Sequence, residues 1–438
     1  MRSHLRRFSP IGDVLWRKTA PPSEFKEVLS GHREAEICIV GGGFCGLHTA
    51  LNLAKEGRSV ILLEAEEIGF GGSGRNAGHC TPTFHHYSLN SIRRLLGEKR
   101  GEKLIQLQLN AADRIADIVH EHNIDCEWVQ NGYVMAAPTP GNLSALQSKV
   151  DSYNAAGQST YLADAEEVRK LTGMKGQFGG WVHPGGAHLN PMGLSRGLAM
   201  AARRHGAGLF VRSRVTEARR TGRKWKVSTT EGSVIAKRVI YTTGAYTQAA
   251  WPKLDKSFRI MRVMVGATKP LPDAIDVLPE NVTAHDGRGN IFVYKRDAFG
   301  RIVASMFPRL FGGREKMLRL LTRRLQYHHP SLPADIEWDC LWTGELDMQP
   351  LTIPRLYHLE EGAVAVTGLS GRGVPTGYTV GQVLSDWARD MPHNDLALPI
   401  EPLRRTPLYM SFGPQLALRG YEMRDRFSEW RSGQKMRP

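Results

Sequence analysis

The stretch from Ile37 to Ala54 constrains the fold of this chain more than any other part of the sequence. A short apolar run rich in β-branched residues, typical of a buried parallel strand, leads into a glycine-rich turn and then into apolar residues at helical spacing. The turn carries glycine at the spacing G-x-G-x-x-G, namely Gly41, Gly43 and Gly46. Such a turn brings backbone N–H groups and the positive end of a helix dipole to a pyrophosphate. It therefore predicts a dinucleotide-binding unit rather than an ordinary tight turn.

A second apolar strand, residues 59–63, follows the helix and ends in Glu64. An acidic side chain roughly 20 residues beyond the glycines can accept a hydrogen bond from a ribose hydroxyl. The order of strand, glycines, helix, second strand and carboxylate supports the same interpretation.

Length and composition are those of an ordinary globular enzyme. The chain has 438 residues, enough for two sizeable domains, of which 41% are hydrophobic and 23% charged. No apolar run approaches the roughly 18 residues that a membrane-spanning helix needs. The five cysteines are odd in number and form no C-x-x-C pair. They argue against a disulfide framework or a zinc site, so we expect a reducing, cytoplasmic compartment and no metal.

The formal net charge of +15 is the unusual feature of the composition, and the basic residues are dispersed along the chain. A solvated basic surface would account for it. An anionic substrate, an acidic partner protein or nucleic acid would do so equally, and the sequence leaves these explanations open.

The remaining elements follow from apolar spacing and helix-start signals. Residues 1–33 are basic and interrupted by prolines, and we expect a leader that lies on the surface. The spacing predicts two helices within residues 89–122 and more helix within 141–172, where Asp164 is an expected N-cap. Further helices are expected at residues 191–205 and 376–389. Strands are expected at residues 126–137, 209–215, 224–229, 233–241 and 363–367, with a hairpin joining 290–295 to 301–306.

Two further glycine-rich segments stand after strands. One is G-S-G-R-N-A-G at residues 72–78, and the other is G-L-S-G-R-G at residues 368–373. Together with the first turn, and in this order, they resemble the signatures of the D-amino-acid-oxidase-type (DAO) family of flavoproteins. The resemblance spans roughly residues 15–395, and it is strongest to the branch that contains γ-glutamylputrescine oxidoreductase and bacterial L-pipecolate oxidase.

The resemblance implies an α/β fold, α+β overall. A glutathione-reductase-like, FAD-binding Rossmann domain would be joined to a substrate domain with a mostly antiparallel β-sheet. The FAD-binding domain would be discontinuous, with residues 34–125, 187–255 and 345–395. The substrate domain would comprise residues 126–186 and 256–344. A basic N-terminal leader (1–33) and a basic C-terminal extension (396–438) would flank them.

The resemblance also implies non-covalently bound FAD and assigns residues to it. Those expected to hold its ADP half are Gly41, Gly43, Gly46 and Glu64. The loop beside the isoalloxazine ring would present Ser73, Arg75, Asn76 and Gly78. The backbone of Val215 would contact the adenine region, and Thr243 and Gly244 would lie near the pyrophosphate. The segment running past the flavin ring would be Gly371, Arg372, Gly373 and Val374.

The implied reaction is oxidation of the C–N bond of a small amine or amino acid. A hydride passes to flavin N5, and the resulting imine hydrolyses. The electron acceptor would be oxygen or an unidentified carrier. The residues expected on the substrate side are Arg372, His79 and Tyr294, together with Tyr133 and Trp342. Many relatives carry histidine where this chain has Arg372, and we expect this arginine, between two glycines, to clamp a substrate carboxylate.

Two alternatives stay open at this point. The chain could be a flavoprotein that acts on a modified tRNA base, for which its basic charge would be suited. It could instead be the FAD-bearing subunit of a heteromeric amine dehydrogenase, in which case the charge would serve a partner.

Overall fold

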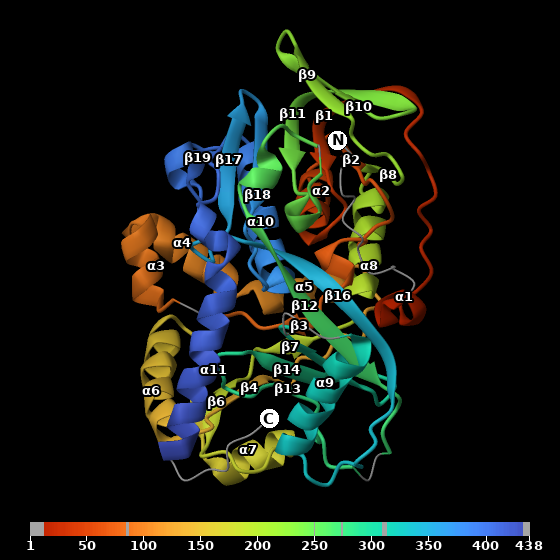
Figure 1. The fold of residues 1–438 in the computed structure, drawn as a ribbon. Helices are drawn as coiled ribbons and strands as arrows, with labels where there is room; N and C mark the ends of the chain where they lie inside the picture. Colours follow the sequence, from red (N-terminus) through yellow and green to blue (C-terminus); the bar gives the residue numbers. More distant parts are fainter. Residues whose placement is uncertain (1–12, 85–86, 249, 273–274, 309–312, 432–438) are drawn as a thin grey trace.

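The computed structural model describes residues 13–84, 87–248, 250–272, 275–308 and 313–431. Two large sheets organise them, a nine-stranded sheet in the upper half of Figure 1 and an eight-stranded sheet in the lower half. The fold is mixed α/β with a Rossmann-like parallel sheet, as predicted. The first twelve residues of the expected leader and the last seven of the expected extension lie outside the described residues.

The nine-stranded sheet has a parallel centre. Its strands, in spatial order, are β19 (Ile400–Pro402), β17 (Arg355–Glu360), β18 (Ala363–Thr367), β11 (Gly232–Tyr241), β1 (Gly31–Val40), β2 (Val60–Leu63) and β8 (Gly208–Phe210). An antiparallel flap of β10 (Lys224–Ser228) and β9 (Glu217–Thr221) extends from β11. Val40 lies opposite both Leu63 and Tyr241. The carboxyl ends of β1, β2 and β11 therefore meet at one edge, where parallel sheets bind ligands.

Three helices lie beside this sheet: α2 (Phe44–Lys55) packs against both α8 (Pro191–Arg204) and α10 (Gly373–Ala388). A β-carbon at Gly377 would crowd Phe44, and one at Gly381 would crowd His48, so glycine permits α2 and α10 to approach closely. Because these two contacts follow the same order, α2 and α10 run in the same direction. Their N-termini therefore lie at the same end.

The eight-stranded sheet is antiparallel except where β13 pairs with β4. Its strands, in spatial order, are β16 (Trp338–Met348), β12 (Arg259–Thr268), β15 (Ile302–Met306), β14 (Phe292–Arg296), β13 (Thr283–His285), β4 (Tyr133–Ala136), β6 (Gly180–His183) and β5 (Tyr161–Ala163). Its neighbouring helices are α6 (Pro140–Ala155), α7 (Ala165–Thr172) and α9 (Arg314–His328). A two-stranded ribbon of β3 (His79–Cys80) and β7 (Ala187–His188) lies between the two large sheets (Figure 1). The predicted hairpin is confirmed as β14 and β15.

Some expected elements differ in number. Residues 89–122 form three helices rather than two: α3 (Leu89–Leu96), α4 (Glu98–Leu109) and α5 (Ala111–Glu121). The break after α3 falls at Gly97, whose φ of +82° ends a helix at little cost. Asp164 caps α7 as predicted, by accepting a hydrogen bond from the backbone N–H of Glu167. The strand β5 interrupts the helical structure expected over residues 141–172, and α10 begins at Gly373 rather than at residue 376.

The expectation of a surface leader is wrong for residues 14–16. Val14, Leu15 and Trp16 are buried, and they open the short helix α1 (Leu15–Thr19). The ring of Trp16 packs edge-to-face on Trp342 of β16, with 6.0 Å between the ring centroids. Burial of these apolar side chains fastens α1 to the eight-stranded sheet and to α8.

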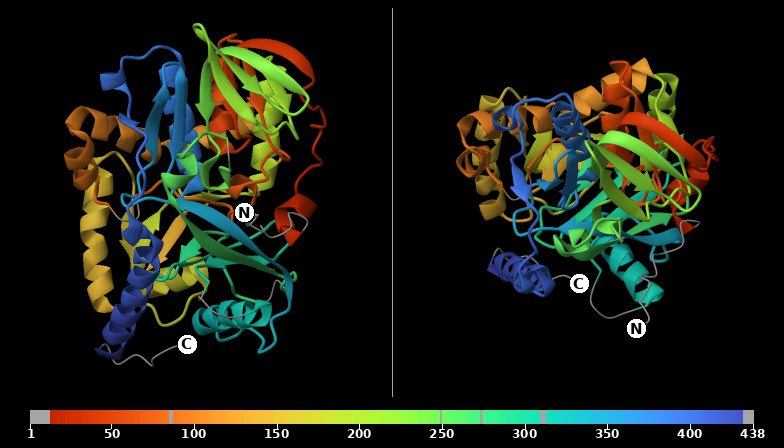
Figure 2. Two further views of the ribbon diagram at one scale, coloured as in Figure 1. Left: turned by 45° about the horizontal axis from the view of Figure 1, so that its top comes forward. Right: turned by 90° about the horizontal axis from the view of Figure 1, so that it is seen from above.

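The chain ends in helix α11 (Gly413–Arg431), preceded by the short 3-10 helix η6 (Leu408–Ser411). Figure 2 shows α11 on the outside of the molecule, alongside the eight-stranded sheet. Within the described residues, no helix has both the length and the apolar character that crossing a membrane requires.

Candidate functional site

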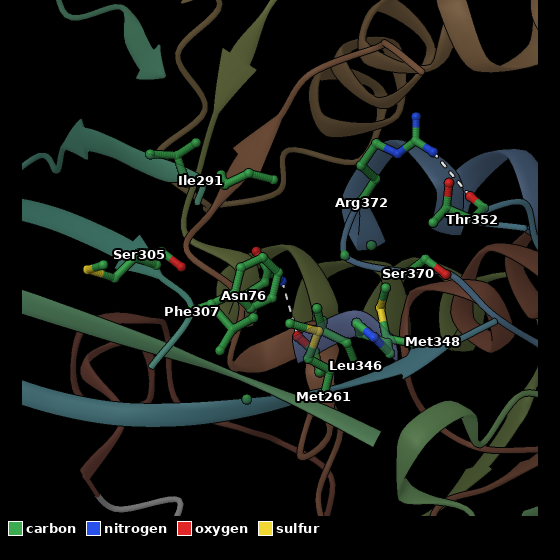
Figure 3. Close-up of a pocket in the computed structure, with 18 of the residues that line it drawn as sticks. Asn76, Met261, Ile291, Ser305, Phe307, Leu346, Met348, Thr352, Ser370 and Arg372 are labelled. Atoms are coloured by element: carbon green, nitrogen blue, oxygen red, sulfur yellow. Dashed lines mark hydrogen bonds between the residues drawn. The ribbon is translucent and has the colours of Figure 1, made fainter. Parts of the chain in front are cut away.

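Two cavities meet between the sheets. The first, which we call the nucleotide cavity, has about 470 Å³ and lies at the carboxyl ends of β1, β2 and β11. The second, which we call the apolar cavity, has about 580 Å³ and lies against β12, β14 and β16 (Figure 3). The residues that line both are Gly72, Asn76, Glu345, Leu346, Gly371 and Gly373. A ligand in the first cavity can therefore reach into the second.

The glycine turn after β1 forms the floor of the nucleotide cavity. Gly41 has a φ of +116°, which favours glycine, and a β-carbon at Gly46 would overlap the carbonyl oxygen of Gly41. Gly43 is the N-cap of α2, with no side-chain cap and no acidic residue in the first turn. Since no carboxylate of its own neutralises it, the N-terminus of α2 suits a phosphate.

Glu64 lies at the end of β2, on the wall of the nucleotide cavity. Its Oε2 accepts a hydrogen bond from the backbone N–H of Gly42 at 2.7 Å, and its Oε1 accepts one from Glu66 at 2.9 Å. Burial raises the pKa of this carboxyl, while the two N–H groups act in the opposite direction. The carboxylate is thereby held beside the glycine turn, as the sequence predicts.

The loop after β2 is rigidly held. Ser73 Oγ accepts from the N–H of Phe44 at 2.9 Å, which ties the loop to the start of α2. The Asn76 amide donates to the carbonyl of Ser73 at 2.7 Å and accepts from the N–H of Gly78 at 2.8 Å. The loop therefore places a fixed backbone along the junction of the cavities.

The expected cofactor residues fall into three groups. Those that line the nucleotide cavity are Gly41, Gly43, Glu64, Ser73, Asn76, Val215, Thr243, Gly244, Gly371 and Gly373. Those that line the apolar cavity only are Arg75, Arg372 and Val374. Gly46 and Gly78 line neither cavity and support the turns behind them, because a β-carbon at either would overlap a neighbouring carbonyl oxygen. The structure thus brings nearly all of these residues to one place.

The N-terminus of α10 is the second helix end at the junction. Arg372 is its N-cap residue, no side chain caps it, and its first turn contains no acidic residue. Two helix N-termini, a glycine cradle and a carboxylate for a ribose therefore converge on the same cavities. These residues fit an adenine dinucleotide.

The side chain of Arg372 is not free to turn, contrary to the expectation. Its guanidinium donates to the carbonyl oxygen of Thr83 and, at 3.3 Å, to that of Thr352. Figure 3 shows it turned toward Thr352 and away from Met261 and Leu346. Burial lowers its pKa to about 10. The arginine joins three segments of the chain. This arrangement favours a structural role, and the carboxylate clamp stays a prediction.

The other expected arginine is also directed at the backbone. The Nε of Arg75 donates to the carbonyl of Phe70 at 2.8 Å, and its guanidinium lies over the ring of Phe70. Burial lowers its pKa. Arg75 and Arg372 are the only arginine or lysine residues among the described residues that line the apolar cavity.

Apolar side chains make up most of the second cavity's wall. Strands β12, β14 and β16 contribute Met261, Val263, Val265, Val293, Leu346 and Met348. Helix η6 and α11 close another side with Tyr409, Met410, Pro414, Ala417, Leu418 and Tyr421. The sequence did not indicate that the C-terminal extension reaches this wall.

Four polar atoms at this cavity are buried and have no hydrogen-bond partner within the described part of the chain. They are His79 Nε2, Tyr133 Oη, Glu345 Oε2 and Thr352 Oγ1. The Nδ1 of His79 is hydrogen-bonded to Thr283 Oγ1, and burial, helped by the charge of Lys295, lowers the pKa of His79 well below its usual range. His79 is therefore neutral at pH 7. Buried polar atoms without partners are rare, so these four are available to a ligand.

Two expected substrate-side aromatics are elsewhere. Tyr294 is fully buried in the core of the second sheet, and its hydroxyl is 2.7 Å from Nε2 of His329. Trp342 is buried, and its indole N–H donates to the carbonyl of Arg75 at 2.8 Å. Neither residue lines either of the two cavities. Tyr294 lies on the opposite face of β14 from the cavity residue Val293. Trp342 lies on the same face of β16 as Leu346 and Met348, but further along the strand, where it packs on Trp16.

Two carboxylates on β16 were missed by the sequence interpretation. Glu345 borders both cavities, and Asp347 lines the nucleotide cavity. Asp347 Oδ2 accepts from the backbone N–H of Gly368 at 2.6 Å, and burial raises its pKa to about 6. No bounds were predicted for this strand from the sequence, and nothing in the sequence showed that these residues would reach a cofactor cavity. Within the described residues, no group of His, Cys, Asp or Glu is placed to hold a metal.

Comparison with known proteins agrees with this geometry. The model of the DAO family, described as FAD dependent oxidoreductase, matches residues 36–387. A probable oxidoreductase OrdL of Rhizobium meliloti is 27% identical, with 96% of this chain and 99% of the relative covered. The gamma-glutamylputrescine oxidoreductase of Escherichia coli is 27% identical, with 85% and 87% covered. The crystal structure of glycine oxidase from Geobacillus kaustophilus has the same fold, with a TM-score of 0.69, 19% identity, and 82% and 95% of the two chains covered.

Proposed function

The chain belongs to the DAO family of FAD-dependent oxidoreductases, and from that premise we propose that it oxidises the C–N bond of a small amine with an apolar body. FAD is the cofactor, and it supplies the acceptor for the hydride that leaves the carbon next to nitrogen. The observation that carries the proposal is the apolar cavity, which adjoins the nucleotide cavity and has a wall that is mostly apolar. A cavity of this kind favours an apolar body and orients it through a few polar contacts.

The residues that would hold FAD follow from the nucleotide cavity. The N-termini of α2 and α10 would face its phosphates and ring system, and Glu64 would accept from the adenosine ribose. Asp347, on the opposite wall, would accept a hydrogen bond from a hydroxyl of the cofactor. Val215, Thr243 and Gly244 would close the cavity on the adenine and pyrophosphate side.

The substrate nitrogen would lie near His79 and Tyr133. Hydride loss requires a neutral amine, since an ammonium has no lone pair to stabilise the positive charge that develops on carbon. The proton of the ammonium would be released to solvent before the amine enters the cavity, because burial and Lys295 disfavour a protonated His79. The neutral His79 and the Tyr133 hydroxyl would then hydrogen-bond the neutral amine and orient it. The apolar wall contributes by orienting the C–H bond and excluding water.

The hydrogen bonds that Arg75 and Arg372 already make favour amines over α-amino acids as substrates. An α-carboxylate in the cavity would require a cation, and both cations present are engaged with backbone carbonyls. A buried carboxylate without a partner is strongly disfavoured. We therefore expect the substrate to lack a carboxylate beside its nitrogen. No specific observation on the described residues favours a tRNA base or a heteromeric complex over a small amine.

The test compares amines with their carboxylated counterparts. The oxygen-free holoenzyme is mixed with 2-phenylethylamine or phenylalanine, and with butylamine or norvaline, and the bleaching of the flavin is followed. Each pair differs only by the carboxylate. We expect the amine to reduce FAD at least about 10-fold faster at equal concentration. Faster reduction by the amino acid in both pairs would contradict the proposed substrate class, and no reduction by any amine would contradict the reaction.

A further inference from the structure

Helix α11 presents a second, unused surface. Its inner side lines the apolar cavity, but five large apolar side chains recur at helical spacing on its outer side or just ahead of it. Their exposed fractions are 71% for Phe412, 69% for Leu416, 73% for Met423, 58% for Phe427 and 63% for Trp430. We call these five the outer stripe. Solvent-facing helix positions are normally polar, so a continuous stripe of this kind indicates a contact surface.

The charges of α11 are divided between its two sides. The acidic residues face inward: Glu422 accepts from Asn290 at 2.7 Å, Asp425 accepts from the N–H of Gly289 at 2.8 Å, and Glu429 forms a buried ion pair with Arg288. The helix is thereby fastened to the loop between β13 and β14. Its outward charges are then all positive.

Four exposed arginines border the outer stripe. Helical spacing places Arg419 and Arg426 along one border and Arg424 and Arg431 along the other. Among the residues that the structure describes, none of the four forms an ion pair with a carboxylate. The outer side of α11 therefore combines Phe, Leu, Met and Trp with flanking arginines, and Figure 2 shows it on the periphery of the molecule, where a flat surface can reach it.

We propose that the outer stripe of α11 docks the enzyme on the surface of a membrane rich in anionic lipids. The apolar side chains would enter the boundary between headgroups and acyl chains, and the arginines would pair with lipid phosphates. A second copy of the chain fits less well, because a two-fold contact through this stripe would bring eight arginines together with no acidic partner on the surface, and the chain already carries a net charge of +15. Nucleic acid fits less well, because the centre of the surface is aliphatic and aromatic rather than cationic.

The docking would place the enzyme in a defined orientation. On the other side of α11 from the stripe, Ala417, Leu418 and Tyr421 line the apolar cavity. A bilayer against the outer stripe would therefore lie directly beyond the wall of that cavity. The inference does not depend on which amine the enzyme oxidises.

The experiment is co-sedimentation of the FAD-loaded full chain with vesicles. Vesicles of phosphatidylcholine with phosphatidylglycerol are compared with vesicles of phosphatidylcholine alone, at low and high salt. We expect binding to the anionic vesicles that falls as salt rises, since surface charge is screened. The double variant Leu416→Ser/Phe427→Ser should lower the partition coefficient at least about 10-fold, because two large apolar side chains no longer enter the bilayer.

Matched control variants show whether binding depends on the outer stripe itself or only on the number of exposed aromatic residues and the net charge of the protein. Phe178→Ser/Phe299→Ser removes two exposed aromatic residues elsewhere and should leave binding unchanged. Arg419→Glu/Arg426→Glu should lower binding about 10-fold or more, whereas Arg223→Glu/Lys226→Glu in the β9–β10 flap makes the same change in net charge and should have a small effect. Light scattering without vesicles measures whether the protein forms dimers, and a gel shift with bulk tRNA measures whether it binds RNA. The proposal would be overturned if the protein did not bind vesicles, or if the control variants lost as much binding as the stripe variants. It would also be overturned if the wild type formed dimers that the stripe variants do not form, or if the protein bound tRNA but not vesicles.

Discussion

The indole N–H of Trp16 donates a hydrogen bond to the carbonyl oxygen of Asn76, at 2.7 Å across 60 residues of sequence. Asn76 belongs to the loop at the junction of the two cavities, and Trp16 belongs to the first described helix. The start of the chain therefore supports the loop that borders the proposed flavin position. The amine of Lys295 lies over the same indole ring, 4.8 Å from its centroid, so the support reaches the second sheet as well.

The first prediction concerns this support. Trp16→Phe keeps an aromatic ring but removes the hydrogen bond, and the carbonyl of Asn76 loses its partner. We expect the free energy of unfolding to fall by about 1–3 kcal/mol and FAD to dissociate faster on dilution. Trp251→Phe, which alters a tryptophan packed on Tyr241, is the control. Equal FAD release from both variants would show that Trp16 does not support the loop.

The second prediction concerns Glu64. Glu64→Ala removes an acceptor for the ribose hydroxyl and leaves the N–H of Gly42 without its carboxylate. A hydrogen bond to a charged group contributes on the order of 1.5–3 kcal/mol, so the dissociation constant of FAD should rise about 10- to 100-fold. The rate of flavin reduction in the FAD-saturated variant should stay near that of the wild type. Unchanged FAD retention would exclude Glu64 as the ribose ligand.

The third prediction is that FAD is bound without a covalent bond. The amide of Asn76, at the loop position beside the expected ring, is engaged with Ser73 and Gly78 and is not a nucleophile. Acid precipitation of the holoenzyme should therefore leave the yellow colour in the supernatant. A yellow pellet would contradict this, and His79→Ala would then show whether His79 forms the bond.

The fourth prediction concerns Arg372. Arg372→Lys keeps the charge, but a single ammonium cannot reproduce the fork that joins the carbonyls of Thr83 and Thr352. We expect a loss of stability of about 1.5–3 kcal/mol and equal effects on amines and their carboxylated counterparts. A selective rise in the Michaelis constant for carboxylated substrates, with stability unchanged, would restore the clamp expected from the sequence.

The fifth prediction concerns the pH dependence of the FAD-free protein. The pKa of Asp347 is raised from 3.8 to about 6 by burial. Between these values the folded state binds more protons than the unfolded state, so this residue lowers the free energy of unfolding as pH rises from about 4 to 6. The total fall is on the order of 3 kcal/mol. Asp347→Asn should remove it from urea titrations at successive pH values, and parallel pH profiles for variant and wild type would contradict the assignment.

Local chemistry explains what the sequence by itself determined. The glycine turn, its flanking strands and Glu64 lie within one continuous stretch, and each residue type there is required by a backbone geometry that its neighbours define. The cap at Asp164 and the helix start at Pro191 are equally local. Such features are set by interactions over a few residues, and the fold class follows from them.

Only the tertiary structure decided where individual side chains point. Arg372 lies between two glycines, which suggests that its side chain can rotate freely. Its hydrogen-bond partners Thr83 and Thr352, however, are 289 and 20 residues away in the sequence. Tyr294 lies on a strand that is largely buried, so no polar alternation distinguishes the cavity face from the core face. The burial of Trp16 and the wall contributed by α11 likewise depend on contacts between distant segments. The hydrophobic effect that drives such burial has no direction along the chain, and the packing of the whole molecule decides which surfaces meet.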